Sequence, residues 1–113
     1  MPKKTIKNHP EADLQADCVQ WLRENGFFCF SVPNEAAYRR IGYFKNLGLL
    51  KGVSDLIIIG LEQVFFIEFK SETGRLSDAQ IAFKMKVEDL GHTYLVIRHI
   101  NDLKRFFGYS IYS

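Results

Sequence analysis

No stretch of this sequence is long and apolar enough to cross a bilayer. The run LIII at residues 56–59 is far shorter than the roughly 20 apolar residues that a transmembrane helix needs. Residues 1–9 are basic, but the segment after them is charged, where a secretory signal peptide would have its apolar stretch. We therefore expect an intracellular protein with no membrane partner, in the cytoplasm or nucleoid of a bacterial or phage-infected host.

Cysteine is scarce, and repeats, linkers and low-complexity segments are absent. Cys18 and Cys29 lie in apolar segments without CxxC spacing or histidine partners, which argues against a zinc site and predicts reduced thiols in the core. The chain has 113 residues, of which 47% are hydrophobic and 25% charged, as in an ordinary globular protein. This length predicts a single domain over residues 1–113, with residues 1–9 as a flexible basic arm.

The chain also lacks a strong excess of charge of one sign. Its formal net charge of +2 does not by itself indicate a nucleic-acid-binding protein. The positive side chains are nevertheless grouped, both in the basic arm and ahead of residue 55. Such groups can neutralise phosphates, and they are as often simply solvated surface. The second group contains Arg39, Arg40, Lys45 and Lys51.

Two apolar segments, residues 56–59 and 64–69, read as strands of one antiparallel hairpin. With the turn centred between Leu61 and Glu62, facing residues have numbers that add up to 123. Asp55 then faces Glu68 with Cβ atoms roughly 5 Å apart. Lys70, two residues further on, projects from the same face as Glu68.

Two facing carboxylates destabilise a sheet unless a cation compensates them. Oxygen ligands at this separation suit a hard divalent ion such as Mg²⁺ or Mn²⁺. Taken singly, Asp55 is also explained as a turn residue, and Glu68 with Lys70 as the solvated face of an edge strand. Because both faces of the second strand are largely apolar, its charged residues are expected to be buried and therefore paired or metal-bound.

The rest of the chain alternates helices and strands. We predict a helix over residues 10–25 with Pro10 first and Gly26 as its stop, and a second helix over residues 77–90 with a Ser77–Gln80 capping box. The inward face of the second helix is predicted to consist of Ala79, Ala82, Phe83, Val87 and Leu90. Strands are predicted over residues 27–32 and 93–98, and Asn101 is expected to cap a short helix. The fold class is therefore α/β, with the order α-β-β-β-α-β and a mixed central sheet flanked by helices.

Residues 34–51 mix tyrosines with basic side chains. This combination suits contacts with a nucleic-acid backbone and its bases, and it equally suits a dimer interface. We predict a helical turn over residues 35–40 and a small edge strand over residues 109–112. Glu11 continues the apolar stripe of the first helix towards the sheet, with Gln15 four residues on over the same side. His92 and His99 flank a predicted strand without a partner in the sequence, and we predict that both lie on the surface.

These residues resemble a known family. Asp55 followed by Glu68-x-Lys70 is similar to the D…(D/E)-x-K signature of the PD-(D/E)xK nuclease superfamily. A wider set of segments, in order along the chain, resembles the VRR-NUC (virus-type replication-repair nuclease) family. The proline that usually precedes the metal-binding aspartate is Ser54 here. The matching segments are EADLQ at residues 11–15, PN at 33–34, GVSD at 52–55, FIEFK at 66–70 and GRLSDAQ at 74–80.

The resemblance implies a metal-dependent nuclease. Asp55, Glu68, the Phe69 carbonyl and Glu11 would hold Mg²⁺ or Mn²⁺, and no organic cofactor is expected. Lys70 would act on the attacking water or the phosphate, and Gln80 would lie near the active site. The expected catalytic set is Glu11, Asp55, Glu68, Lys70 and Gln80, and the expected nucleic-acid contacts are Asn34, Arg39, Arg40, Lys45, Lys51 and Arg75.

We therefore expect a DNA endonuclease that works as a homodimer, or as the catalytic unit of something larger, and that is selective for branched DNA such as Holliday junctions. The main alternative is a nucleic-acid-binding module that keeps a nuclease fold without catalysis. A hydrolase of small phosphoesters would need a closed pocket, of which the sequence gives no sign. A purely structural α/β adaptor would have no use for charged residues in apolar strands.

Overall fold

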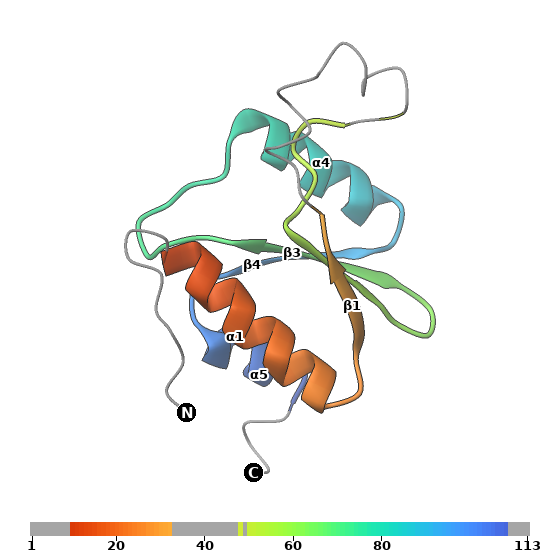
Figure 1. The fold of residues 1–113 in the computed structure, drawn as a ribbon. Coiled ribbons are helices and arrows are strands. Elements are labelled where there is room, and N and C mark those ends of the chain that lie inside the picture. Colours follow the sequence, from red (N-terminus) through yellow and green to blue (C-terminus); the bar gives the residue numbers. More distant parts are fainter. Residues whose placement is uncertain (1–9, 33–47, 49, 109–113) are drawn as a thin grey trace.

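The computed structural model describes residues 10–32, residue 48 and residues 50–108. Within these ranges the chain forms helices and strands in the predicted order (Figure 1). The elements are α1 (Pro10–Glu24), β1 (Phe28–Ser31), β2 (Leu56–Ile59), β3 (Val64–Phe69), α4 (Asp78–Asp89), β4 (Thr93–Ile97) and α5 (Ile100–Phe106).

Some predicted features lie outside the described residues and stay predictions. These are the basic arm over residues 1–9, the helical turn over residues 35–40, the edge strand over residues 109–112, and the candidate nucleic-acid contacts Asn34, Arg39, Arg40 and Lys45.

The four strands form one mixed sheet in the order β1-β2-β3-β4. The pairs β1–β2 and β2–β3 are antiparallel, whereas β3 and β4 are parallel. Parallel neighbours cannot be joined by a tight turn, and here α4 makes the crossover between them. The predicted α/β class and element order are confirmed.

The register of the β2–β3 hairpin is the predicted one. Leu56 pairs with Ile67 and Ile59 with Val64, so that paired numbers add up to 123. The Gly60 N–H donates to the Gln63 carbonyl at 2.9 Å and closes the connection around Leu61 and Glu62. A shift of one residue would turn every buried side chain of this hairpin to the opposite face, which is why the register is specific.

The helices cover the two faces of the sheet differently. In Figure 1, α1 and α5 lie on one side of the sheet and α4 lies on the other. The main core is on the α1 side, where Cys18 and Leu22 pack with buried strand residues such as Ile58 and Ile67. On the α4 side, the Phe83 ring contacts Phe66 at 5.2 Å and Tyr94 at 6.1 Å between centroids. Alternate residues of β3 therefore face two different packed layers.

Helix α1 ends as its sequence indicates. Gly26 has a φ of 83°, which favours glycine, and its N–H donates to the Arg23 carbonyl at 3.2 Å. The Phe27 N–H donates to the Leu22 carbonyl at 2.9 Å, which completes a Schellman motif. Cys18 and Cys29 are buried free thiols, as predicted. Among the described helices, none has the length and apolarity to span a membrane.

Two predictions about helix packing are wrong. Leu90 was expected to face inward from α4, but it caps the helix and is 70% exposed, because the chain has already turned away from the sheet there. Ala82 is likewise exposed, so Phe83 and Val87 carry the packing of this helix.

The cap of α5 is also not the predicted one. His99, and not Asn101, is the N-cap residue, and its N–H donates to the Asp102 carboxylate at 3.1 Å.

Both histidines predicted to lie on the surface have partners. The Val64 N–H donates to His92 Nδ1 at 3.0 Å, and His99 Nε2 lies 3.1 Å from a Glu72 carboxylate oxygen.

Candidate active site

The predicted catalytic residues surround one cavity, where β2 begins, β3 ends and α4 starts. Its volume is about 260 Å³. Five side chains far apart in the sequence meet there, from α1, the hairpin and α4. Its described lining comprises Glu11, Lys51, Gly52, Val53, Asp55, Glu68, Lys70, Ser77, Ala79 and Gln80.

Asp55 is held at the start of β2 by backbone groups on both sides. The Phe69 N–H donates to its Oδ2 at 2.9 Å, and the Val32 N–H donates to its carbonyl at 2.9 Å. Its carboxylate is thereby tied to the strand that carries Glu68. Ser54, the residue before Asp55, is fully buried and donates its hydroxyl to the Leu56 carbonyl at 3.3 Å. The serine therefore supports the same turn with a hydrogen bond.

Glu68 is a buried carboxylate that is only partly satisfied. It is 4% exposed, and its Oε2 accepts a hydrogen bond from Gln80 Nε2 at 3.0 Å. Lys70 Nζ lies 3.8 Å from the same oxygen. The other oxygen, Oε1, is buried and accepts no hydrogen bond from a described residue. When Glu68 is protonated, its carboxyl donates a hydrogen bond to the Asp55 carboxylate, and this bond is lost when both groups ionise. Burying an acceptor in this way is unfavourable, so Oε1 is suited to bind a further donor or a cation.

The electrostatics of Asp55 and Glu68, the acidic pair of the site, also favour binding of a cation. Burial, followed by the charge of Asp55, raises the pKa of Glu68 from 4.5 to about 8. Burial also raises the pKa of Asp55 above 3.8, despite its hydrogen bond from Phe69. Lys70 favours the ionised form of both groups without reversing these shifts. The two carboxyls cannot both ionise easily until more positive charge arrives.

Glu11 stands at the edge of this cavity. It belongs to the first turn of α1 and is exposed, and its Oε2 accepts a hydrogen bond from the Ser71 N–H at 3.2 Å. Within the described residues, no three His, Cys, Asp or Glu side chains are gathered closely enough to hold a metal ion by themselves. The structure thus brings Asp55 and Glu68 together as a pair and leaves Glu11 beside them.

Gln80 has both positions expected of it. The Ser77 N–H donates to its Oε1 at 2.8 Å, and its own N–H donates to Ser77 Oγ at 3.2 Å, which is the predicted capping box. Its Nε2 reaches Glu68. One amide therefore joins the first turn of α4 to the buried carboxylate.

Gly52 allows α4 to approach the acidic pair. Its φ is 93°, and an added Cβ would lie 2.3 Å from the Ala79 carbonyl oxygen. Only glycine permits this contact between two backbones. The close approach places the Gln80 end of α4 directly over the turn that leads to Asp55.

Two residues near the site had no distinguishing pattern in the sequence. The Arg98 guanidinium donates to the carbonyls of Ser71, Glu72 and Gly74 and so holds the loop between β3 and α4. Tyr94 is a buried residue of β4 whose hydroxyl has no hydrogen-bond partner among the described residues. Tyr94 lies within an apolar strand and Arg98 directly after it. The residue type at such a position does not indicate which distant groups the side chain will contact.

Of the predicted nucleic-acid contacts that the structure describes, Lys51 is exposed and lines the cavity. Arg75 is exposed on the loop before α4.

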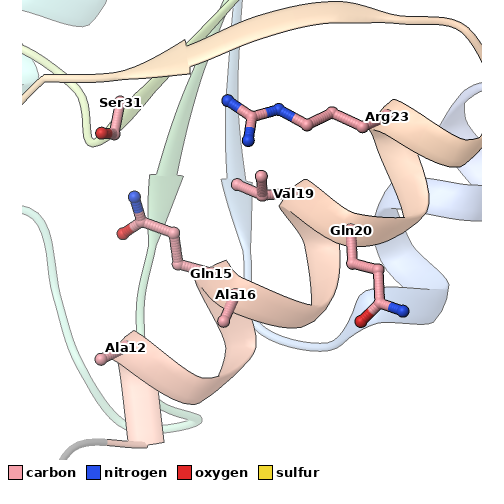
Figure 2. Close-up of a pocket in the computed structure, with 7 residues that line it drawn as sticks. All are labelled: Ala12, Gln15, Ala16, Val19, Gln20, Arg23 and Ser31. Atoms are coloured by element: carbon pink, nitrogen blue, oxygen red, sulfur yellow. The ribbon is translucent and has the colours of Figure 1, made fainter.

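Gln15, in contrast, does not face the acidic pair. It lines a second cavity of about 530 Å³ between α1 and β1, where its amide and the Arg23 guanidinium both extend towards Ser31 (Figure 2). Gln15 was predicted to lie over the same side of the helix as Glu11, four residues earlier, but its side chain lines a different cavity.

Comparisons with known proteins agree with this fold. The family model of the VRR-NUC domain matches residues 6–98 of the chain. One solved structure, of a VRR_NUC domain protein, has a TM-score of 0.74 and 19% sequence identity, covering 90% of this chain and 88% of the other. At this identity the likeness concerns the fold. No curated protein matches the sequence significantly.

The family match extends from just before α1 to just beyond β4, and it includes the hairpin and the first turn of α4 that together form the cavity. Because it covers well over half of the sequence, the chain belongs to the VRR-NUC domain family and is a nuclease-type domain.

Proposed function

We propose that the chain is a Mg²⁺- or Mn²⁺-dependent DNA endonuclease that hydrolyses phosphodiester bonds. The observation that supports this proposal is the meeting of the Asp55 and Glu68 carboxyls, with Glu68 Oε1 buried and accepting no hydrogen bond from a described residue. Their hard oxygen atoms and their raised pKa values fit a divalent cation, which would replace the missing positive charge.

Asp55 and Glu68 would hold the metal, together with the Phe69 backbone carbonyl at the end of β3 and with Glu11 directly or through water. When bound, the metal supplies an activated water and a positive charge close to the phosphate oxygens. The hydrogen bond from Phe69 to Asp55 and that from Gln80 to Glu68 orient the two carboxylates. Such supporting contacts fix the direction in which ligand oxygens point.

The position of Lys70 beside Glu68 supports a role at the reacting phosphate. Its Nζ lies 3.8 Å from Glu68 Oε2, and its side chain is 16% exposed, so it is largely withdrawn from solvent. A lysine there would orient the attacking water or offset negative charge that develops on the phosphate. Such a contact is needed mainly in the transition state.

We further propose that the active form is a homodimer selective for branched DNA such as four-way junctions. A domain of 113 residues covers only part of a duplex. Two active sites related by a two-fold axis would match a symmetric branched substrate. This part of the proposal follows from analogy with the family, and light scattering tests the dimer directly.

The decisive experiment is a cleavage assay with Mn²⁺ on labelled four-way junction, flap and linear duplex DNA, run beside Asp55→Ala and in EDTA. We expect cleavage of the branched substrates by the wild type, and none in EDTA or with Asp55→Ala. Tight DNA binding in EDTA without any Mn²⁺-dependent cleavage would instead identify a binding module that keeps a nuclease fold. Equal cutting of linear duplex and junctions by a monomer would remove the branched-DNA proposal and leave the nuclease.

Lys70→Ala provides a second arm of the same assay. It should slow single-turnover cleavage far more than it weakens DNA binding, because its interaction belongs to the transition state. An equal loss in both quantities would identify Lys70 as a binding residue only.

A further inference from the structure

Two buried polar atoms near the site lack hydrogen-bond partners, and they are complementary. Among the buried side-chain nitrogen and oxygen atoms that the structure describes, only Glu68 Oε1 and the Tyr94 hydroxyl are in this condition. A carboxylate oxygen accepts hydrogen bonds, whereas a phenol can donate one. Native proteins seldom leave such atoms unpaired, so two of them in one region call for a common explanation.

The two residues lie on the same side of the sheet. Strands β3 and β4 are parallel neighbours in which Phe66 pairs with Tyr94 and Glu68 with Val96. Phe66, Glu68 and Tyr94 therefore all face α4, because alternate residues of a strand share a face. Phe83 of α4 packs against both aromatic rings.

The Tyr94 hydroxyl also lies within the electrostatic influence of the acidic pair. Burial raises the pKa of Tyr94 above its usual value, and the charges of Glu68 and then Asp55 raise it further. The phenol therefore stays protonated and keeps its proton available for donation. Packing alone does not account for the hydroxyl, since a phenylalanine would fill the same space against Phe83.

We propose that Tyr94 is a positioning residue of the site, whose hydroxyl donates a hydrogen bond to a buried water that in turn donates to Glu68 Oε1, since the two atoms are not bonded to each other directly. Glu68 would then be held at both ends, by Gln80 at Oε2 and by Tyr94, through this water, at Oε1. An ionised carboxylate oxygen has two lone pairs, so Oε1 can accept this bond and still bind a metal. The inference rests on the proposed metal-dependent function, and it concerns how the ligand is oriented.

Tyr94→Phe tests the inference, because it removes only the hydroxyl. The metal-free variant should keep the wild-type circular dichroism spectrum and melt at a lower temperature, since a hydrogen bond has been lost. Its Mn²⁺ affinity, measured by electron paramagnetic resonance without DNA, should fall about tenfold, as is typical when a residue that orients a metal ligand is changed. Phe83→Leu is the control for packing, because it loosens the contact with the Tyr94 ring and leaves the hydroxyl in place.

The outcomes separate this inference from the proposed function. If Tyr94→Phe melts at the same or a higher temperature, the hydroxyl was truly unpaired and the inference is overturned. A lower melting temperature with unchanged Mn²⁺ affinity, or an equal loss of affinity in Phe83→Leu, overturns the positioning role. A wild type that neither binds Mn²⁺ nor cuts DNA refutes the proposed function, while the metal-free melting comparison still decides whether the hydrogen bond exists.

Discussion

Glu68 is the residue whose surroundings differ most from those of an ordinary glutamate. It is buried, it faces another carboxylate, and its two nearest donors reach the same oxygen. An isolated charge in such a place is costly, so the residue stays protonated until a cation or a higher pH favours its ionised form. The properties of this single side chain therefore link the stability of the domain to its proposed metal chemistry.

This link predicts a pH dependence of stability. Because the pKa of Glu68 is about 8 in the folded protein and 4.5 in its ordinary state, the folded protein binds more protons between these values. Stability of the metal-free protein should therefore fall as the pH rises from about 4.5 to about 8. Asp55, whose pKa is also raised, acts in the same direction.

Thermal melts in EDTA across this range measure the effect, with Glu68→Gln as the matched variant. The glutamine has nearly the same shape and cannot ionise, so its melting temperature should fall less with rising pH. Identical slopes for the two proteins would show that Glu68 ionises normally. Added Mg²⁺ should restore stability most at the high end of the range, since it binds the ionised carboxylates.

At the scale of elements, the site depends on how α4 approaches the hairpin. The capping box places Gln80 at the start of α4, and Gly52, which faces Ala79, lets this end of the helix approach the hairpin closely. Helix capping and site geometry thus rely on the same few residues, and two substitutions separate these contributions.

Gln80→Glu should preserve the cap and damage the site. Glutamate is as good as glutamine at this position of a capping box. It cannot donate to Glu68, however, and it adds a like charge beside the acidic pair. We expect a helix content close to that of the wild type and a loss of Mn²⁺ affinity of about 10- to 100-fold. Wild-type metal affinity in this variant would mean that the contact between Gln80 and Glu68 has no role in the site.

Gly52→Ala should displace α4. The added methyl group would collide with the Ala79 carbonyl, and the φ of 93° is itself unfavourable for alanine. We expect a loss of about 2 kcal/mol or more in the free energy of unfolding. Gly26→Ala is the matched control, because it has a similar φ of 83° with nothing within 4 Å of the added Cβ. It should cost about 1 kcal/mol, because only the left-handed backbone conformation is then unfavourable, and denaturant unfolding of both variants would reveal the difference. Equal losses would mean that the backbone contact is easily relaxed.

For the whole molecule, the question is how a chain with a net charge of only +2 would bind DNA beside two carboxylates. Lys51 lies in the wall of the cavity, and Arg75 lies on the loop between β3 and α4. Both provide positive charge on the side of the molecule that carries the acidic pair. Local charge, and not the net charge, would then govern the approach of a phosphate backbone.

DNA affinity measured at several salt concentrations tests this view. Lys51→Ala and Arg75→Ala should each weaken binding for all DNA sequences and reduce the slope of log affinity against log salt by about 1. Lys84→Ala is the control, because Lys84 lies further along α4 and pairs with Glu88 at 3.5 Å. An unchanged slope in the first two variants would place the DNA elsewhere on the surface.

The sequence by itself determined the elements and the most important local geometry. Pro10 and Gly26 mark the ends of α1, and the hairpin register follows from the position of a short turn between two apolar runs. Because residues paired across a hairpin are close in sequence, the meeting of Asp55 and Glu68 was predictable. The contacts of Arg98, the burial of Tyr94 and the exposure of Leu90 were not predictable, since each depends on how separate elements pack.

Only the tertiary structure decided what surrounds the acidic pair. The reach of Gln80 to Glu68, the bond between Ser71 and Glu11, and the contact of Gly52 with Ala79 all join segments that are distant or differently oriented in the chain. No periodicity or cap encodes such distances. They arise when helices dock on the two faces of the sheet, because close packing then allows few positions for each side chain.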